Sequence, residues 1–369
     1  MSRVPRAGAG QAVEPGPDPR PGPRLRTGWT TGTCASAAAK AAALGLVDGA
    51  PPDRVVVTLP DGRRVGFAVE VESINRCVVV KDAGDDPDCT NGARMTAEVA
   101  AAPEGTVTGM RAGPGVGTVT LPGLGLAVGS PAINPVPRRM ILSALAEVTD
   151  QPLDVTLSVP GGEAMAEHTS NARLGIVGGI SVLGTTGIVR PFSTASWRAS
   201  VVQQVDVAAA QGERTIVLAT GSRSDVAAQR LLPRLPTVCF VEVGDFTGIA
   251  LRRAAAAGMR RAVFVGMAGK IAKLAAGVMM THFHRSRVDG DVLARAALEA
   301  VAPPEVLAAA TATATARHFF ETCVQAGWTS PLEVLCLWAR RACEAHCAGA
   351  LAVEILMVDF DGQEMVARA

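Results

Sequence analysis

Carboxylates are concentrated in one short stretch of the chain, the DAGDDPD sequence at Asp82–Asp88. Neighbouring carboxylates raise one another's pKa, so Asp85 and Asp86 are candidate catalytic residues acting as a general base. A calcium loop fits less well, because Asn91 stands where that loop requires glycine. The spacing alone is also typical of an exposed Asp-rich turn without chemistry.

Two groups of basic side chains are candidate contacts for an anionic substrate. Lys270 and Lys273 are three residues apart and so share a helix face, and Arg138 and Arg139 form a second pair after the sequence INPVP. Guanidinium and ammonium groups bind carboxylates through charge-assisted hydrogen bonds. A solvated basic face explains both groups equally well.

Metal binding is a weaker interpretation of the remaining polar residues. His282 and His284 form an HxH pair, which needs a third ligand before it can hold zinc. Cys336, Cys343 and Cys347 repeat at the spacing of a buried helix face, where free cysteine is common. We therefore expect no protein-bound metal.

Threonine and glycine alternate just before an alanine-rich segment that ends near Leu46. The spacing predicts a helix with Thr31 or Thr33 as N-cap and Gly45 as the residue that ends it. Its first N–H groups and its dipole would attract an anion, but the spacing alone favours a buried packing helix. The predicted substrate contacts in this stretch are Thr30, Thr31, Gly32 and Thr33.

Turns rich in glycine and threonine follow several apolar strand candidates in the second half. We expect them at the carboxyl edge of one sheet, where open α/β folds bind ligands. Asp245 has two interpretations, an acceptor for ribose hydroxyls or the N-cap of a helix near Thr247. The predicted cofactor contacts are Gly184, Thr185, Thr186, Gly187, Gly244, Asp245 and Gly266.

The element pattern predicts two domains after a disordered tail at 1–24. Strands and two helices over 25–168 suggest an α+β domain, with a hairpin around Pro60-Asp61-Gly62. Alternating strands and helices over 169–369 suggest an α/β domain with a mainly parallel, Rossmann-like sheet. Its first strand is expected at Gly175–Leu183 and its C-terminal helix at Pro331–Cys347.

Composition narrows the function classes. The chain has 369 residues, a net charge of +1 and 4% aromatic residues, which argues against nucleic-acid binding. The N-terminal segment lacks the apolar core of a signal peptide, no stretch is apolar enough to span a membrane, and eight cysteines in a chain this long are no disulfide framework. We expect a cytoplasmic protein, with a homo-oligomer left open.

Several segments together resemble the cobalt-precorrin-5B C1-methyltransferase family (CbiD type) of cobalamin biosynthesis. The matches are LRTGWTTGTCASAAAK at Leu25–Lys40, KDAGDDPDCTNGA at Lys81–Ala93, GSPAINPVPRRMI at Gly129–Ile141, GIVGGISVLGTTGIVRPFS at Gly175–Ser193, VGDFTGIAL at Val243–Leu251 and GKIAKLAAGVMMTHFH at Gly269–His284. His282 matches the more recurrent histidine of the family's THxH pattern and becomes a third catalytic candidate. The chain departs from the family at Trp29, Cys89 and Asn91, where Tyr, Val and His are usual.

The resemblance implies an enzyme that methylates C1 of cobalt-precorrin-5B with S-adenosylmethionine and yields cobalt-precorrin-6A in the anaerobic-type pathway. The cobalt would belong to the substrate. A non-catalytic tetrapyrrole carrier or scaffold is the alternative that the three departures leave open. A nicotinamide-dependent oxidoreductase is disfavoured, because the chain has no GxGxxG sequence.

Overall fold

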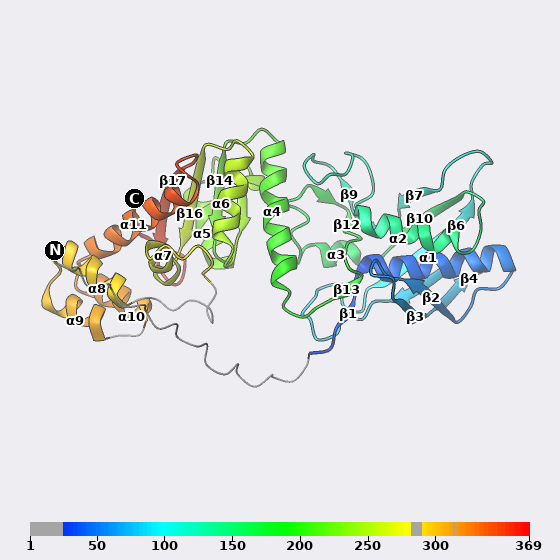
Figure 1. Ribbon diagram of the computed structural model, residues 1–369, viewed down its shortest axis with the longest axis horizontal. Helices are drawn as coiled ribbons and strands as arrows, with labels where there is room; N and C mark the ends of the chain where they lie inside the picture. Colours follow the sequence, from blue (N-terminus) through cyan, green and yellow to red (C-terminus); the bar gives the residue numbers. More distant parts are fainter. Residues whose placement is uncertain (1–24, 282–289, 313–314) are drawn as a thin grey trace, which may run out of the picture.

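The computed structural model describes residues 25–281, 290–312 and 315–369. The described chain forms two lobes with the long helix α4 (Thr194–Ala210) standing between them (Figure 1). The expected tail at 1–24 and the candidate His282 lie outside the described residues. Among the helices that the structure describes, none is long and apolar enough to cross a membrane.

The N-terminal lobe is built around helix α1 (Thr31–Asp48), which packs against a five-stranded sheet and against α2 (Pro135–Ala146). The sheet order is β4-β5-β6-β10-β7, and only the β10–β7 pair in it is parallel. Its strands are β4 (Glu70–Ser73), β5 (Arg76–Val80), β6 (Arg94–Ala101), β10 (Leu153–Ser158) and β7 (Gly109–Ala112).

Helix α1 confirms the expected buried helix and corrects both of its ends. Thr30 is the N-cap, and its hydroxyl accepts a hydrogen bond from Thr33 N, so Thr31 and Thr33 are not the cap. The helix passes through Gly45 and ends at Asp48, with Gly49 as its C-cap in the left-handed conformation (φ of 82°). Gly45 is needed for another reason, since a Cβ there would lie 1.9 Å from the carbonyl oxygen of Ile74. Glycine thus permits close packing here instead of ending the helix.

Smaller pairs complete the N-terminal lobe. The predicted hairpin is confirmed, because β2 (Arg54–Thr58) and β3 (Arg64–Ala68) pair in antiparallel register. The expected strand at Gly175–Leu183 is wrong as part of the second sheet. It forms two short strands, β11 (Ile176–Val177) and β12 (Gly179–Ile180), that pair with N-terminal partners. The remaining short elements are β1 (Gly28–Trp29), β8 (Gly115–Val116), β9 (Thr118–Val119), α3 (Gly162–Ala166) and β13 (Ile188–Val189).

The C-terminal lobe contains a second five-stranded sheet, in the order β15-β14-β16-β17-β18. The first four strands are parallel and β18 is antiparallel, so the chain is a mixed α/β protein whose two large sheets are both mixed. The strands are β14 (Thr215–Ala219), β15 (Phe240–Glu242), β16 (Arg261–Gly266), β17 (Ala352–Val358) and β18 (Met365–Arg368).

This second sheet packs against the helices α5 (Ser222–Leu231), α6 (Thr247–Ala256), α7 (Ala268–Ala275) and α11 (Ser330–His346). Three further helices, α8 (Gly290–Glu299), α9 (Pro304–Ala312) and α10 (Ala316–Gln325), pack against α7, α11 and one another, and a short 3-10 turn η1 (Thr237–Cys239) precedes β15. The predicted C-terminal helix is therefore confirmed as α11. Each lobe has its own main hydrophobic core. In sequence, the last residue of the first core is Val182 and the first residue of the second core is Val201.

Candidate functional site

A cavity of about 440 Å³ opens in the N-terminal lobe against one face of α4. Segments that are far apart in the sequence meet there: the start of α1, the acidic loop, the start of α2, the turn at 169–174 and the segment from β12 onward. Its lining includes Thr30, Thr31, Lys81, Asp88, Thr90, Asn134, Ser170, Asn171, Gly184, Thr185, Ala199, Ser200 and Gln203. The cavity therefore joins four of the segments by which the chain resembles a known family.

The start of α1 is held by the segment Leu183–Gly187. Thr31 Oγ1 accepts a hydrogen bond from Leu183 N at 2.9 Å, and Thr33 Oγ1 donates to Gly187 O at 2.7 Å. Gly32 N donates to Leu183 O, and Thr33 N is bound to Thr30. The N–H groups of Gly32 and Thr33 are therefore not free for an anion, contrary to the prediction.

The glycines of this region bring the chain against itself. A Cβ on Gly184 would lie 2.5 Å from the side chain of Thr30, and a Cβ on Gly28 would lie 2.1 Å from the backbone of Ala83. The turn Gly184–Gly187 consequently lies against α1 and not at the edge of the second sheet. The prediction that this turn lies at the carboxyl edge of the second-half sheet is wrong, because the strand before it belongs to the N-terminal lobe.

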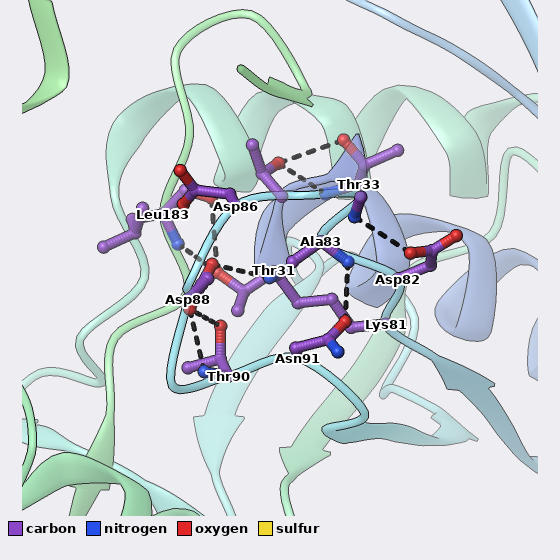
Figure 2. Close-up of polar contacts among 12 residues, drawn as sticks. Thr31, Thr33, Lys81, Asp82, Ala83, Asp86, Asp88, Thr90, Asn91 and Leu183 are labelled. Atoms are coloured by element: carbon purple, nitrogen blue, oxygen red, sulfur yellow. Dashed lines mark hydrogen bonds and ion pairs between the residues drawn. The ribbon is translucent and has the colours of Figure 1, made fainter. Parts of the chain in front are cut away.

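A buried ion pair forms the polar floor of the cavity. Lys81 Nζ donates to Asp88 Oδ2 at 2.7 Å, with side-chain exposures of 1% and 23%. Asp88 Oδ1 accepts from both the N–H and the hydroxyl of Thr90, beside Thr31 (Figure 2). Burial raises the pKa of Asp88, but the hydrogen bonds from Lys81 and Thr90 outweigh it and the net pKa is lowered. Asp88 is thus a charged anchor and a poor proton acceptor at neutral pH.

The two predicted catalytic carboxylates of the same loop serve as tethers. Asp85 accepts a hydrogen bond from the backbone of Arg26, and Asp86 Oδ1 accepts one from Phe192 N at 2.8 Å. Phe192 has a φ of 55°, which is rare for a non-glycine residue, so Asp86 holds a strained turn. Neither Asp85 nor Asp86 lines the cavity. The charged residues that do line the cavity are Lys81 and Asp88. The sequence signal for this pair is Lys81, a lysine directly after the apolar strand β5.

The predicted cofactor residues of the second lobe lie at a separate place. Gly244 and Asp245 follow the carboxyl end of β15, and Gly266 is the last residue of β16, so these residues lie at the expected edge of the sheet. Lys270 Nζ donates to Gly244 O at 2.7 Å and pairs with Asp245 at 3.0 Å. Asp245 is not the N-cap of α6, since Phe246 holds that position. The carboxylate of Asp245 is therefore already paired with the ammonium group of Lys270.

Lys273 is buried and is not part of a solvated basic face. Its Nζ donates to Thr281 O at 3.1 Å, and burial lowers its pKa. Arg138 and Arg139 are exposed, and no ion pair joins them to any residue in the described ranges. Of the predicted substrate contacts, these two arginines alone remain unengaged cations in the described part of the chain.

The cysteines of α11 belong to the hydrophobic core, as their spacing predicts. Burial raises the pKa of both Cys336 and Cys343 to about 12, so both are thiols at neutral pH. Among the described residues no group of His, Cys, Asp or Glu could hold a metal ion.

A bidentate ion pair that sequence reasoning missed connects the two lobes. Arg173, in the turn that ends at the cavity wall, binds Asp225 on α5 and donates to Phe240 O at 3.2 Å. The Asp225 side chain is 7% exposed. The wall carrying Ser170 and Asn171 is therefore anchored to the second sheet.

The chain is similar to known proteins over most of its length. The family model described as CbiD matches residues 18–191, and the model described as CbiD, C-terminal domain matches residues 280–369. Relatives named cobalt-precorrin-5B C(1)-methyltransferase are 57% identical in Salinispora arenicola (92% of this chain, 92% of the relative) and 56% identical in Rubrobacter xylanophilus (92% and 90%). The crystal structure of cobalamin biosynthesis protein (cbiD) from Archaeoglobus fulgidus is 31% identical, covers 71% of this chain and 83% of that one, and has a TM-score of 0.40.

Proposed function

Because the chain belongs to the CbiD family, we propose that it methylates C1 of cobalt-precorrin-5B, with S-adenosylmethionine as methyl donor, and yields cobalt-precorrin-6A. Relatives named for this methyl transfer match over nine-tenths of their own length. The cobalt is bound within the tetrapyrrole substrate and so needs no ligand from the protein. The proposal accordingly requires two ligand sites and no resident metal.

The observation that carries the proposal is the convergence of family-matched segments on one cavity. Thr31, Lys81 and Asn134 come from three distant segments, yet all three line it. Thr31 begins α1, Lys81 follows β5 and Asn134 caps α2, so three separate elements direct polar residues toward one open space. Sites where polar groups converge on a cavity of this size are typical ligand sites.

The donor set of the cavity fits the proposed methyl donor. Hydroxyl and carboxamide groups suit ribose hydroxyls, an adenine edge and an amino-acid group. When bound, this donor supplies an electrophilic methyl group on a positively charged sulfur. The C–S bond breaks as the C–C bond at C1 forms, the electron pair stays on sulfur, and the positive charge passes to the acceptor, which can discharge it as a proton.

The protein's part in such a reaction is to position two ligands and exclude water. Asp88 is held ionised and fully hydrogen-bonded by Lys81 and Thr90, so we assign it to a fixed negative charge in the wall. The exposed Arg138 and Arg139 remain our candidates for carboxylates of the acceptor. Lys270 and Lys273 are weaker candidates, since both already bind backbone carbonyls.

We also propose a two-domain organisation with a Rossmann-like second sheet. The four parallel strands with helices between them support that description. The core of the first lobe includes Ile180 and Val182, which supports a domain boundary near α4 and not at residue 168. All eight cysteines are unpaired, which supports a reducing cytoplasm.

The direct test is a methyl-transfer assay under anaerobic conditions with cobalt-precorrin-5B and isotopically labelled S-adenosylmethionine. We expect one labelled methyl group on the tetrapyrrole, detected by mass spectrometry, with S-adenosylhomocysteine in equal amount. Tetrapyrrole binding without methyl transfer would instead support the carrier alternative.

A further inference from the structure

We propose that the cavity beside α4 is the pocket of the methyl donor, and that the tetrapyrrole lies outside it across its mouth. This assignment rests on the proposed function and adds to it which ligand takes which place. The sequence-based expectation placed the donor at the turn Gly184–Gly187 and also at the turns at the ends of β15 and β16. The proposal keeps Gly184 and Thr185, which line the cavity, and leaves out the turns of the second sheet.

The first support is size. A cavity of about 440 Å³ lies within the range of pockets that enclose a nucleoside-sized ligand. A tetrapyrrole with carboxylate side chains around its whole rim is far larger and flat. Such a ligand fits across an opening better than inside this cavity.

The second support is a set of unused hydrogen-bonding side chains. Asn134, Ser170, Thr185 and Gln203 all line the cavity. Their side chains make no hydrogen bond to any other residue that the structure describes. They come from four separate elements and are all neutral. Convergent neutral donors and acceptors without internal partners are what a nucleoside or an amino-acid group would satisfy.

The third support is charge. Within the described lining, Lys81 is the one cationic side chain, and it is already bound to Asp88. Enclosing several carboxylates there would leave them without counter-charges, at a high cost in desolvation. Arg190 and Arg198 are exposed and adjoin the lining residues Val189 and Ala199 in sequence. Neither forms an ion pair within the described ranges, so both are available to a polyanion at the mouth.

The main test fills the cavity without touching the core. Ala199 is exposed on the first half of α4 and faces the cavity, so Ala199→Trp adds an indole to the proposed pocket. Ala256→Trp, at an exposed position on α6, is the matched control. Titration calorimetry of the full chain with S-adenosylhomocysteine should show binding to the wild type and the control, and at least a hundred-fold weaker binding to Ala199→Trp. Circular dichroism melting checks that both variants fold.

A second pair of variants each removes one hydrogen-bonding side chain from the cavity. These variants test the pocket assignment even if the tryptophan at position 199 disturbs α4. Gln203→Leu and Asn134→Ala should each weaken S-adenosylhomocysteine binding by about three- to ten-fold, the usual effect of losing one neutral hydrogen bond. Gln151→Leu changes an exposed glutamine outside the cavity and should have no effect.

Three results would overturn different statements. Wild-type affinity in folded Ala199→Trp and in Gln203→Leu would refute the pocket assignment. If Lys270→Ala then lost the binding, the donor would belong to the edge of the second sheet while the proposed reaction still stood. Absence of S-adenosylhomocysteine binding to the wild type would contradict the proposed function itself.

Discussion

Replacing Asp88 by Asn should cost the protein more stability than replacing Lys81 by Met. The side chain of Lys81 is 1% exposed, and its ammonium group has Asp88 as its sole hydrogen-bond partner within the described residues. Asp88→Asn leaves that charge buried without a counter-charge, which costs about 3 kcal/mol even though the new carbonyl can still accept a hydrogen bond. Lys81→Met leaves Asp88 23% exposed and still bound by Thr90, so about 1–2 kcal/mol is expected.

Thermal unfolding followed by circular dichroism measures the difference. At about 2–4 °C per kcal/mol, Asp88→Asn should lower the Tm of the N-terminal lobe by roughly 6–12 °C, and Lys81→Met by roughly 2–8 °C. The double variant Lys81→Met/Asp88→Asn should be more stable than Asp88→Asn alone, because no charge is then left unpaired. Equal losses in the two single variants would show that the ammonium is not desolvated as described.

Four shorter predictions concern the pH dependence of Asp88 and three other sites. Because the pKa of Asp88 is lowered in the folded state, its contribution to stability is complete above the unfolded value of about 3.9 and is lost as pH falls through the folded pKa, so the Tm gap between wild type and Asp88→Asn should close in acid. Arg173→Lys cannot form the bidentate contact to α5 and should lower the Tm, with faster proteolysis around the cavity wall; unchanged values would show that the lobes are held by other contacts. Gly45→Ala should destabilise by about 1–3 kcal/mol in urea unfolding, since its Cβ would meet the carbonyl of Ile74. Cys89 should be the thiol that reacts with a disulfide reagent in the native protein, while the other seven react after unfolding.

Local features could be predicted from the sequence where a short-range rule decides them. The hairpin around Asp61-Gly62 and the buried helix α1 follow from turn chemistry and composition, and both are confirmed. Gly45 shows the limit, because its role depends on Ile74, which lies across the fold and not next to it in the chain. Strand pairing is equally non-local, so an apolar run at Gly175–Leu183 could be read as a strand without revealing which sheet it would join.

The candidate site likewise combines local features, which the sequence predicts, with non-local ones, which it does not. The sequence identifies the acidic loop and favours its adjacent Asp85 and Asp86, whereas Asp88 is the aspartate of this loop that lines the cavity. The partner that decides this is Lys81, a single residue whose burial depends on the sheet beneath it. Likewise, Gln203 carries no motif at all, and only the position of α4 between the lobes brings it to the cavity.

The position of α4 determines how the protein can be cut into pieces. Val201 and Val205 on this helix belong to the core of the second lobe, whereas Val207 packs with Ile176 of the first. A truncation at residue 191, where the first family match ends, would remove one wall of the cavity and strip Ile176 of its neighbour. Such a fragment would expose apolar surface and aggregate during expression, whereas one extended through Ala210 would carry its own exposed valines. Soluble halves would therefore require either co-expression, so that the two pieces meet around α4, or polar replacements along the helix face that each piece leaves bare.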